Sequence, residues 1–67
     1  MNDKMKKARL EKNLSQTELA KIIGVSRQTI IAIENNKYNP TLELAMRLAR
    51  YLHTTVEELF VLEEEAR

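Results

Sequence analysis

Two short helical patterns joined by one glycine occupy the segment from Ser15 to Asn35, SQTELAKIIGVSRQTIIAIEN. Ser15 and Glu18 form the S-x-x-E pattern of a capping box, which predicts a helix that begins directly after Ser15. Gly24 is the chain's only glycine and takes positive φ at no steric cost, so we expect this helix to end there. Ser26 then caps a second helix that runs to about Asn35. In a chain of 67 residues, this segment constrains the fold more than any other.

The rest of the chain is also predicted to be helical, because it holds one proline and three aromatic residues. An apolar stripe predicts a first helix over residues 3–12, ended by Asn13. Thr41 opens a fourth helix, and Thr55 with Glu58 forms a second capping box for a short fifth helix. A chain of this length is one domain, so we expect an all-α, five-helix domain over residues 1–67, with a tail at 61–67. The residues expected inside are Met5, Ala8, Arg9, Leu19, Ala20, Ile22, Ile23, Ile30, Ile33, Leu42, Ala45, Leu48, Ala49, Leu52, Val56, Leu59 and Phe60.

The composition argues against several classes of site. Without cysteine there are no disulfides or thiolate zinc ligands, and the single histidine, His53, cannot build a metal site alone. No apolar run approaches the roughly 20 residues of a membrane span, and the N-terminus lacks the apolar segment of a signal peptide. No Ser-His-Asp set or glycine-rich phosphate loop suggests an enzyme. We therefore expect a cytoplasmic protein with no metal and no cofactor, and with His53 at the end of the fourth helix.

The charges are divided unevenly along the chain, although the net charge is only +1. Residues 1–40 carry eight Lys or Arg against four Asp or Glu, a balance of +4, and residues 41–67 carry three against six, a balance of −3. This division predicts a polarised surface, able to steer toward phosphates on one side. The alternative is that the charges are ordinary solvated helix faces.

Two charged residues fall on apolar stripes. With Ile30 and Ile33 on the buried side of the third helix, a step of about 100° per residue places Glu34 beside them. Arg9 lies one turn after Met5 on the inner stripe of the first helix. A buried carboxylate needs a partner, and a guanidinium can meet it with two parallel hydrogen bonds. We therefore predict an Arg9–Glu34 ion pair that ties the first helix to the third, with two surface charges as the alternative.

The same helical wheel turns a polar face of the third helix outward. Arg27 lies at its exposed N-terminal edge, followed by Gln28, Ile31, Ala32 and Asn35. Arginine can form paired hydrogen bonds to the O6 and N7 atoms of guanine, glutamine can do the same to adenine, and small apolar side chains can contact the thymine methyl group. These residue types, in the first turns of the second helix of a pair, favour a recognition helix in the major groove of DNA. The alternative is an ordinary polar face.

These motifs together resemble the helix-turn-helix family of phage Cro proteins and repressors, which includes small bacterial and archaeal relatives similar to the xenobiotic-response-element regulators. The resemblance covers roughly residues 4–60. It is carried by Arg9, Leu14-Ser15-Gln16, Leu19-Ala20, Gly24-Val25-Ser26, Ile30, Ile33-Glu34-Asn35 and Pro40. It implies a compact lambda-repressor-like fold in which residues 15–35 form the helix-turn-helix. One departure is Asn36, where the family commonly has glycine; asparagine tolerates left-handed φ less freely, so the loop can differ locally.

The resemblance also implies which residues contact DNA. In the family, a glutamine at the start of the second helix bonds a phosphate, and Gln16 fills that place, beside the free amides of the helix N-terminus. Thr29 lies nearer the groove wall, and the loop after the third helix touches the backbone. The expected base contacts are Arg27, Gln28, Ile31 and Ala32, and the expected phosphate contacts are Gln16, Ser26, Thr29, Asn35, Lys37, Tyr38 and Asn39.

Members of the family usually bind as dimers on two half-sites about 34 Å apart, which predicts a homodimer on a palindromic operator. The candidate dimer surfaces lie late in the chain, at Leu44, Met46, Tyr51, Val61 and Leu62. We expect residues 59–62 either to form a short strand that pairs with its symmetry mate or to extend the last helix. The alternative for Val61 and Leu62 is that they cover their own subunit.

Repression by occlusion is the simpler expectation, because the sequence shows no activation domain. We also expect no small-molecule effector domain, because a sequence of this length leaves no room for one. The rival class is a protein-interaction module such as an antitoxin, which shares the helical frame. A DNA reader needs Arg27 and Gln28, whereas a partner-binding face would tolerate their loss.

Overall fold

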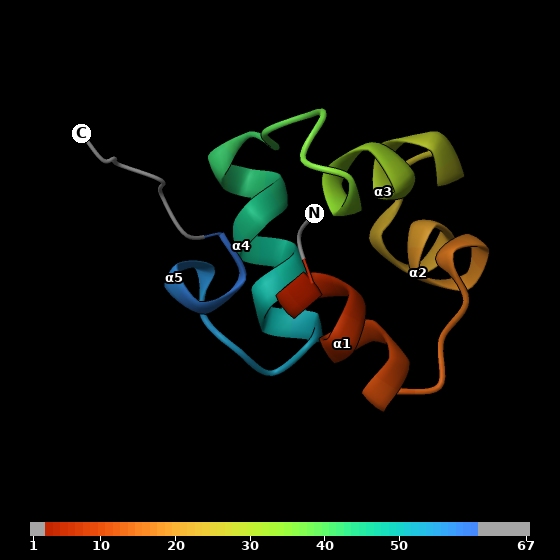
Figure 1. Cartoon of the computed structure of the whole chain (residues 1–67), viewed down its shortest axis with the longest axis horizontal. Coiled ribbons are helices and arrows are strands. Elements are labelled where there is room, and N and C mark those ends of the chain that lie inside the picture. The colour runs from red at the N-terminus through yellow and green to blue at the C-terminus, as the bar shows by residue number, and fades with distance from the viewer. Residues whose placement is uncertain (1–2, 61–67) are drawn as a thin grey trace.

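The computed structural model describes residues 3–60, and five α-helices follow one another along this range (Figure 1). They are α1 (Asp3–Glu11), α2 (Gln16–Ile23), α3 (Arg27–Glu34), α4 (Leu42–Tyr51) and α5 (Val56–Leu59). Between residues 3 and 60 there is no strand. In Figure 1, α1 and α4 lie in the middle, with α2 and α3 on one side and α5 on the other. The predicted all-α, five-helix fold is confirmed.

The predicted C-terminal strand lies mostly outside the described residues, which end at Phe60. The helix itself ends at Leu59, and Phe60 has extended backbone angles (φ −125°, ψ 90°). The helix therefore does not continue into Phe60. Val61 and Leu62, which carry the strand prediction, belong to the part of the chain that the structure does not describe.

Side-chain caps fix where four of the helices begin. Ser15 Oγ accepts a hydrogen bond from the N–H of Glu18 at 3.0 Å, and Glu18 Oε1 accepts one from the N–H of Ser15 at 2.8 Å, which completes the predicted capping box. Ser26, Thr41 and Thr55 accept from the N–H three residues later in the same way. At Thr55 the structure shows this one half of the second box.

A residue with left-handed φ follows each of the first four helices. These residues are Asn13 (φ 59°), Gly24 (φ 93°), Asn36 (φ 58°) and His53 (φ 58°). After α3, Lys37 donates its N–H to Ala32 at 2.8 Å and Asn36 donates to Ile33 at 3.1 Å, the two bonds of a Schellman motif. Asn36 thus adopts the left-handed conformation for which glycine is the usual residue, so the substitution does not prevent this turn.

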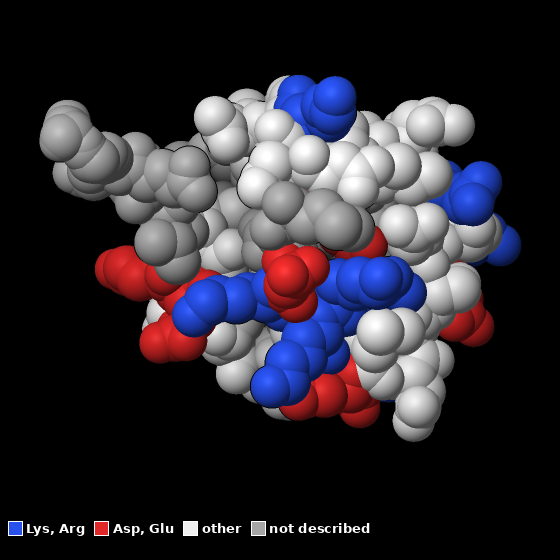
Figure 2. All heavy atoms as spheres, viewed as in Figure 1, with Lys and Arg blue, Asp and Glu red and all other residues white. Residues whose placement is uncertain are grey.

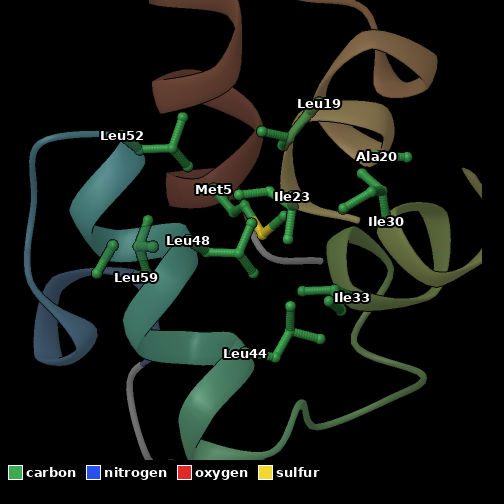
Figure 3. Close-up of a cluster of buried hydrophobic side chains, with 11 residues drawn as sticks. Met5, Leu19, Ala20, Ile23, Ile30, Ile33, Leu44, Leu48, Leu52 and Leu59 are labelled. Carbon is green, nitrogen blue, oxygen red and sulfur yellow. The ribbon is translucent and has the colours of Figure 1, made fainter. Parts of the chain in front are cut away.

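The core gathers around Met5, which is completely buried, and all five helices contribute to it (Figure 3). Its members are Met5, Leu19, Ala20, Ile23, Ile30, Ile33, Leu44, Leu48, Ala49, Leu52 and Leu59. Leu19, Ile30, Ile33 and Leu48 are also fully buried. The inner faces of α2 and α3 therefore pack on the same centre as α1 and α4, and this packing fixes how the two-helix unit is presented.

Three apolar residues differ from the sequence expectation. Ile22 is 46% exposed and Leu42 is 70% exposed, although both were expected inside. Ile22 lies about 100° around α2 from the centre of the buried stripe, and Leu42 is in the first turn of α4, beyond the core. Leu44 is only 9% exposed, because it packs beside Ile33 of α3 (Figure 3).

A buried ion pair ties α1 to α3, as the sequence predicted. Arg9 Nε donates to Glu34 Oε2 at 2.7 Å and Nη2 donates to Oε1 at 3.3 Å. A third donor, Nη1, reaches the carbonyl of Leu14 at 2.8 Å, directly before Ser15, the N-cap of α2. Both side chains are almost wholly removed from solvent. Removing one partner would leave the other charge buried without compensation.

Candidate nucleic-acid interface

α3 has one face in the core and one face outside. Ile30, Ile33 and Glu34 are buried, and together they hold the helix against α1, α2 and α4. Arg27 and Gln28, in the first turn, are exposed. The other two predicted base contacts, Ile31 and Ala32, are half-buried at the edge of the outer face. The structure thus brings the four predicted base-contacting residues onto one helix.

The N-terminus of α3 is held by a compact hydroxyl pair. Ser26 Oγ accepts from the N–H of Thr29 at 3.1 Å, and the two hydroxyl oxygens lie 3.0 Å apart, at hydrogen-bond distance. Ser26 is exposed and Thr29 is half-buried. Their mutual bond fixes the orientation of both hydroxyls beside Arg27 and Gln28. The sequence indicated the cap, but it gave no signal for the bond between the two side chains.

The start of α2 is connected to the buried ion pair through Gln16. Gln16 Nε2 donates to Glu34 Oε1 at 3.1 Å, so the carboxylate receives hydrogen bonds from both Arg9 and Gln16. An amide nitrogen carries two hydrogens, and the second remains for an anion outside. The capping box satisfies the N–H groups of Ser15 and Glu18, and those of Gln16 and Thr17 are the other two that lack an intrahelical acceptor. Nothing in the sequence pattern indicated the Gln16–Glu34 bond.

The loop after α3 carries the remaining predicted contacts at the surface. Asn35 is the C-terminal cap of α3, and Asn35, Lys37, Tyr38 and Asn39 are all exposed. The Schellman bonds of Asn36 and Lys37 fix the first part of this loop to the end of α3. The backbone of Lys37 is therefore held at the end of α3, while the residue is exposed to solvent.

Lys and Arg side chains gather over α1 in the centre of the face shown in Figure 2, with Asp and Glu beside them. Separate basic side chains project at the edges over the loop after α3 and over the region of α2 and α3. On this face the two signs are therefore mixed over α1. Near the outer face of α3, the exposed cations at the predicted contact positions are Arg27 and Lys37.

The residues proposed from sequence for a dimer contact do not share one environment. Leu44 is a core residue, so the prediction that it lies at a surface between subunits is wrong. Tyr51 is half-buried against the core, and Lys12 Nζ lies 5.4 Å from the centre of its ring. Met46 is 55% exposed. The remaining candidates, Val61 and Leu62, lie outside the described range.

This arrangement suits binding to a polyanionic double helix. The first turn of a capped helix presents an arginine and a glutamine, small apolar side chains lie beside them, and hydroxyl, amide and ammonium groups flank both ends. Within residues 3–60, no cluster of acidic or histidine side chains has the geometry to hold a metal ion. None of the helices in this range combines the length and apolar character of a membrane span.

The comparisons with known proteins agree with this geometry. A helix-turn-helix family model matches residues 5–59. An uncharacterised helix-turn-helix transcriptional regulator of Methanocaldococcus jannaschii is 48% identical over 97% of this chain and 98% of its own length. The transcriptional repressor RstR of a cryptic CTXphi phage in Vibrio cholerae is 34% identical over 87% of this chain and 52% of its own. The transcriptional activator BcrR of Enterococcus faecalis is 35% identical over 94% of this chain and 31% of its own. The chain belongs to the helix-turn-helix family of DNA-binding transcriptional regulators of the Cro and phage-repressor type.

Proposed function

We propose that the protein is a sequence-specific repressor that binds double-stranded DNA as a homodimer, with α3 in the major groove of each half-site of a palindromic operator. The observation that carries this proposal is the exposure of Arg27 and Gln28 on the first turn of α3, while the opposite face of the helix is fixed in the core. A recognition helix needs this combination, because base reading requires free side chains on a backbone that does not move.

The base contacts follow from the donors and methyl groups that α3 presents. Arg27 has the fork of donors that suits the O6 and N7 atoms of guanine, and Gln28 can bond adenine through its amide. Ile31 and Ala32 offer apolar surface to a thymine methyl, and the small side chain of Ala32 lets the helix approach the bases closely. Each good paired contact is worth about 1–3 kcal/mol of discrimination against the wrong base.

The phosphate contacts would hold α3 in register at both ends. Gln16 offers its second amide hydrogen together with the unpaired N–H groups at the start of α2. Ser26 and Thr29 form a hydroxyl pair at the start of α3. Asn35, Lys37, Tyr38 and Asn39 line the exposed loop at its other end. Contacts of this kind position a protein on the duplex without reading its sequence.

Repression is the mode that these features support best. Occlusion of a promoter requires binding to DNA and no further activity, and the helix-turn-helix domain supports this mode. One relative of this chain is described as a repressor and another as an activator, so the family permits both. The chain corresponds to about a third of that activator's length, whereas it covers about half of the repressor. A cytoplasmic location accords with this role.

Selection of bound sequences from a random pool of duplex DNA tests the proposal. We expect one palindromic sequence to be enriched, with half-site centres about 34 Å apart, one turn of the helix. A sequence without two-fold symmetry would contradict the dimer. Retention of the pool without any enrichment would contradict sequence-specific recognition.

The rival reading is an antitoxin-like interaction module on the same helical frame. The two functions differ in their need for the outer face of α3. A DNA reader needs Arg27 and Gln28 for affinity, whereas a partner-binding module would tolerate their loss. If Arg27→Ala and Lys37→Ala both bound DNA as the parent protein does, the repressor proposal would be wrong and the interaction module would be favoured.

A further inference from the structure

The outer face of α4 is apolar where the DNA contacts proposed above do not reach. Leu42 is 70% exposed and Met46 is 55% exposed, the highest values among the large apolar side chains of the described residues. They lie one turn apart on α4, and Arg50 continues the same line one turn later. With Glu43 and Arg47, these side chains line a shallow hollow of ≈ 410 Å³.

The charges of Glu43 and Arg50 are complementary to their own two-fold copy, while Nη2 of Arg47, which also lines the hollow, lies toward Gly24 at the end of α2. Glu43 and Arg50 are seven residues, or two turns, apart and are placed almost symmetrically about Met46. If two α4 helices cross antiparallel with the axis beside Met46, Glu43 of each copy lies near Arg50 of the other, about 10 Å along the helix from the matching pair. Leu42 then packs on the aliphatic part of Arg50, and the two Met46 side chains meet.

We propose that this face, defined as Leu42, Glu43, Met46 and Arg50 and called the α4 stripe, is where two copies of the chain associate on DNA. The inference rests on the proposed homodimer and names its surface, which differs from the tail residues Val61 and Leu62. The occupant is a second copy because the stripe carries both signs of charge in an order that an antiparallel copy matches. A partner of one charge sign would meet repulsion from either Glu43 or Arg50.

The size of the stripe predicts how strongly the copies associate. A standard stable interface uses about 20–30 residues on each side, and the stripe offers four. We therefore expect weak self-association of the free protein. On DNA with two half-sites, a shared duplex raises the effective concentration of the second copy, so the contact becomes visible as cooperative binding.

Charge reversal tests the pairing. The variants are Glu43→Arg, Arg50→Glu and the two together, and self-association is measured by sedimentation of the free protein at increasing concentration. Each single change places like charges opposite each other and should lower the association constant at least tenfold. The double change restores opposite charges and should bring the association constant back to within about threefold of the parent. Each reversal places a charge that opposes the dipole of α4 at one of its ends, so the double variant should have the lowest melting temperature of the three. If the double variant nevertheless regains association, the recovery is not caused by increased stability.

Two matched polar substitutions test the apolar part. Met46→Ser should reduce cooperativity on DNA with two half-sites at least tenfold, while leaving affinity for a single half-site within twofold of the parent. Leu10→Ser is the control, because Leu10 is 51% exposed on α1 and lies outside the stripe, and it should change neither value.

The outcomes separate the two proposals. If the double reversal associates no better than the single variants, or if Met46→Ser behaves as the parent does, the α4 stripe is not the dimer surface, even where specific DNA binding is retained. If the free protein associates through the stripe but enriches no DNA sequence, the stripe stands and the proposed function fails.

Discussion

The two faces of α3 differ in their surroundings, although their side chains are neighbours in sequence. The inner face, with Ile30, Ile33 and Glu34, is fixed by packing and by the ion pair to Arg9. The outer face, with Arg27 and Gln28, makes none of these contacts and is open to solvent. Changes on the inner face should therefore lower stability, and changes on the outer face should lower DNA affinity without lowering stability. If α3 is the recognition helix, as we propose, substitutions on its outer face can change the target sequence without loss of the fold.

Gln16 is expected to contribute both to stability and to DNA binding. It donates to Glu34, the carboxylate at the centre of the inner network, and it lies half-buried at the start of α2, where we propose a phosphate contact. A substitution of Arg9 should therefore change stability, and a substitution of Arg27 should change DNA affinity. A substitution of Gln16 is expected to change both.

The largest effect is expected from Arg9→Met. The change leaves the carboxylate of Glu34 buried and the carbonyl of Leu14 without its guanidinium donor, so the free energy of unfolding should fall by about 3–5 kcal/mol. Urea denaturation followed by circular dichroism measures it. The double variant Arg9→Met with Glu34→Met is the control, because it removes both charges, and it should regain most of the loss. A decrease of only a few tenths of a kcal/mol in the single variant would show that the pair does not hold the inner face.

Arg27→Ala is expected to act on the outer face alone. Affinity for the selected operator should fall by about 1–3 kcal/mol, while an exposed substitution should change unfolding by less than about 0.5 kcal/mol. Fluorescence anisotropy gives the affinity, and Lys6→Ala, an exposed cation of α1, is the matched control. A loss of stability as large as the loss of affinity would remove the separation between the faces.

Lys37→Ala should affect DNA binding in another way. If its ammonium group meets a phosphate, the change weakens binding to all sequences alike and lowers the slope of log affinity against log salt by about one. Titrations at several salt concentrations with operator and random DNA measure both. If the ratio of the affinities for operator and random DNA also changed, Lys37 would contact bases instead of a phosphate.

Gln16→Ala should affect both properties by about 1 kcal/mol, through the lost hydrogen bond to Glu34 and the lost phosphate contact. Parallel unfolding and binding measurements distinguish the contributions. Reduced stability with unchanged affinity would make Gln16 a support for Glu34 only.

The smallest effects are gains in stability at the left-handed turns. Asn36→Gly and His53→Gly should each raise the free energy of unfolding by about 0.5–1 kcal/mol, because glycine takes positive φ without steric cost. Thermal denaturation measures both. Asn36 adjoins the proposed phosphate contacts and His53 does not, so an affinity change confined to Asn36→Gly would show that the side chain of Asn36 also contacts DNA. A decrease in stability at His53 would mean that its side chain stabilises the turn.

The sequence predicted the contacts of the inner face for a physical reason. Helical periodicity and the cost of burying a charge placed Arg9 and Glu34 together, and capping chemistry placed Ser15, Gly24 and Ser26 at helix ends. Periodicity within one helix says nothing about neighbouring helices. The prediction for Leu44 is therefore wrong, because Ile33 of α3 packs beside it and buries it. The Gln16–Glu34 bond joins two residues that are 18 positions apart in sequence, one on α2 and one on α3, and it has no local signal. The left-handed φ of His53 had none either.

The helical wheel, the side-chain chemistry and the family resemblance together predicted the outer face, and its DNA contacts stay predictions. The structure shows that Arg27 and Gln28 are both exposed on the first turn of a helix whose other face is buried in the core, and their base contacts are our proposal. Sequence selection with the parent and with Arg27→Ala, under the same conditions, therefore tests the central claim most directly. We predict that the parent enriches a palindrome and that the variant loses its preference at one base position in each half-site while keeping the others. Identical preferences for the two proteins at every position would contradict the assignment of α3 as the recognition helix.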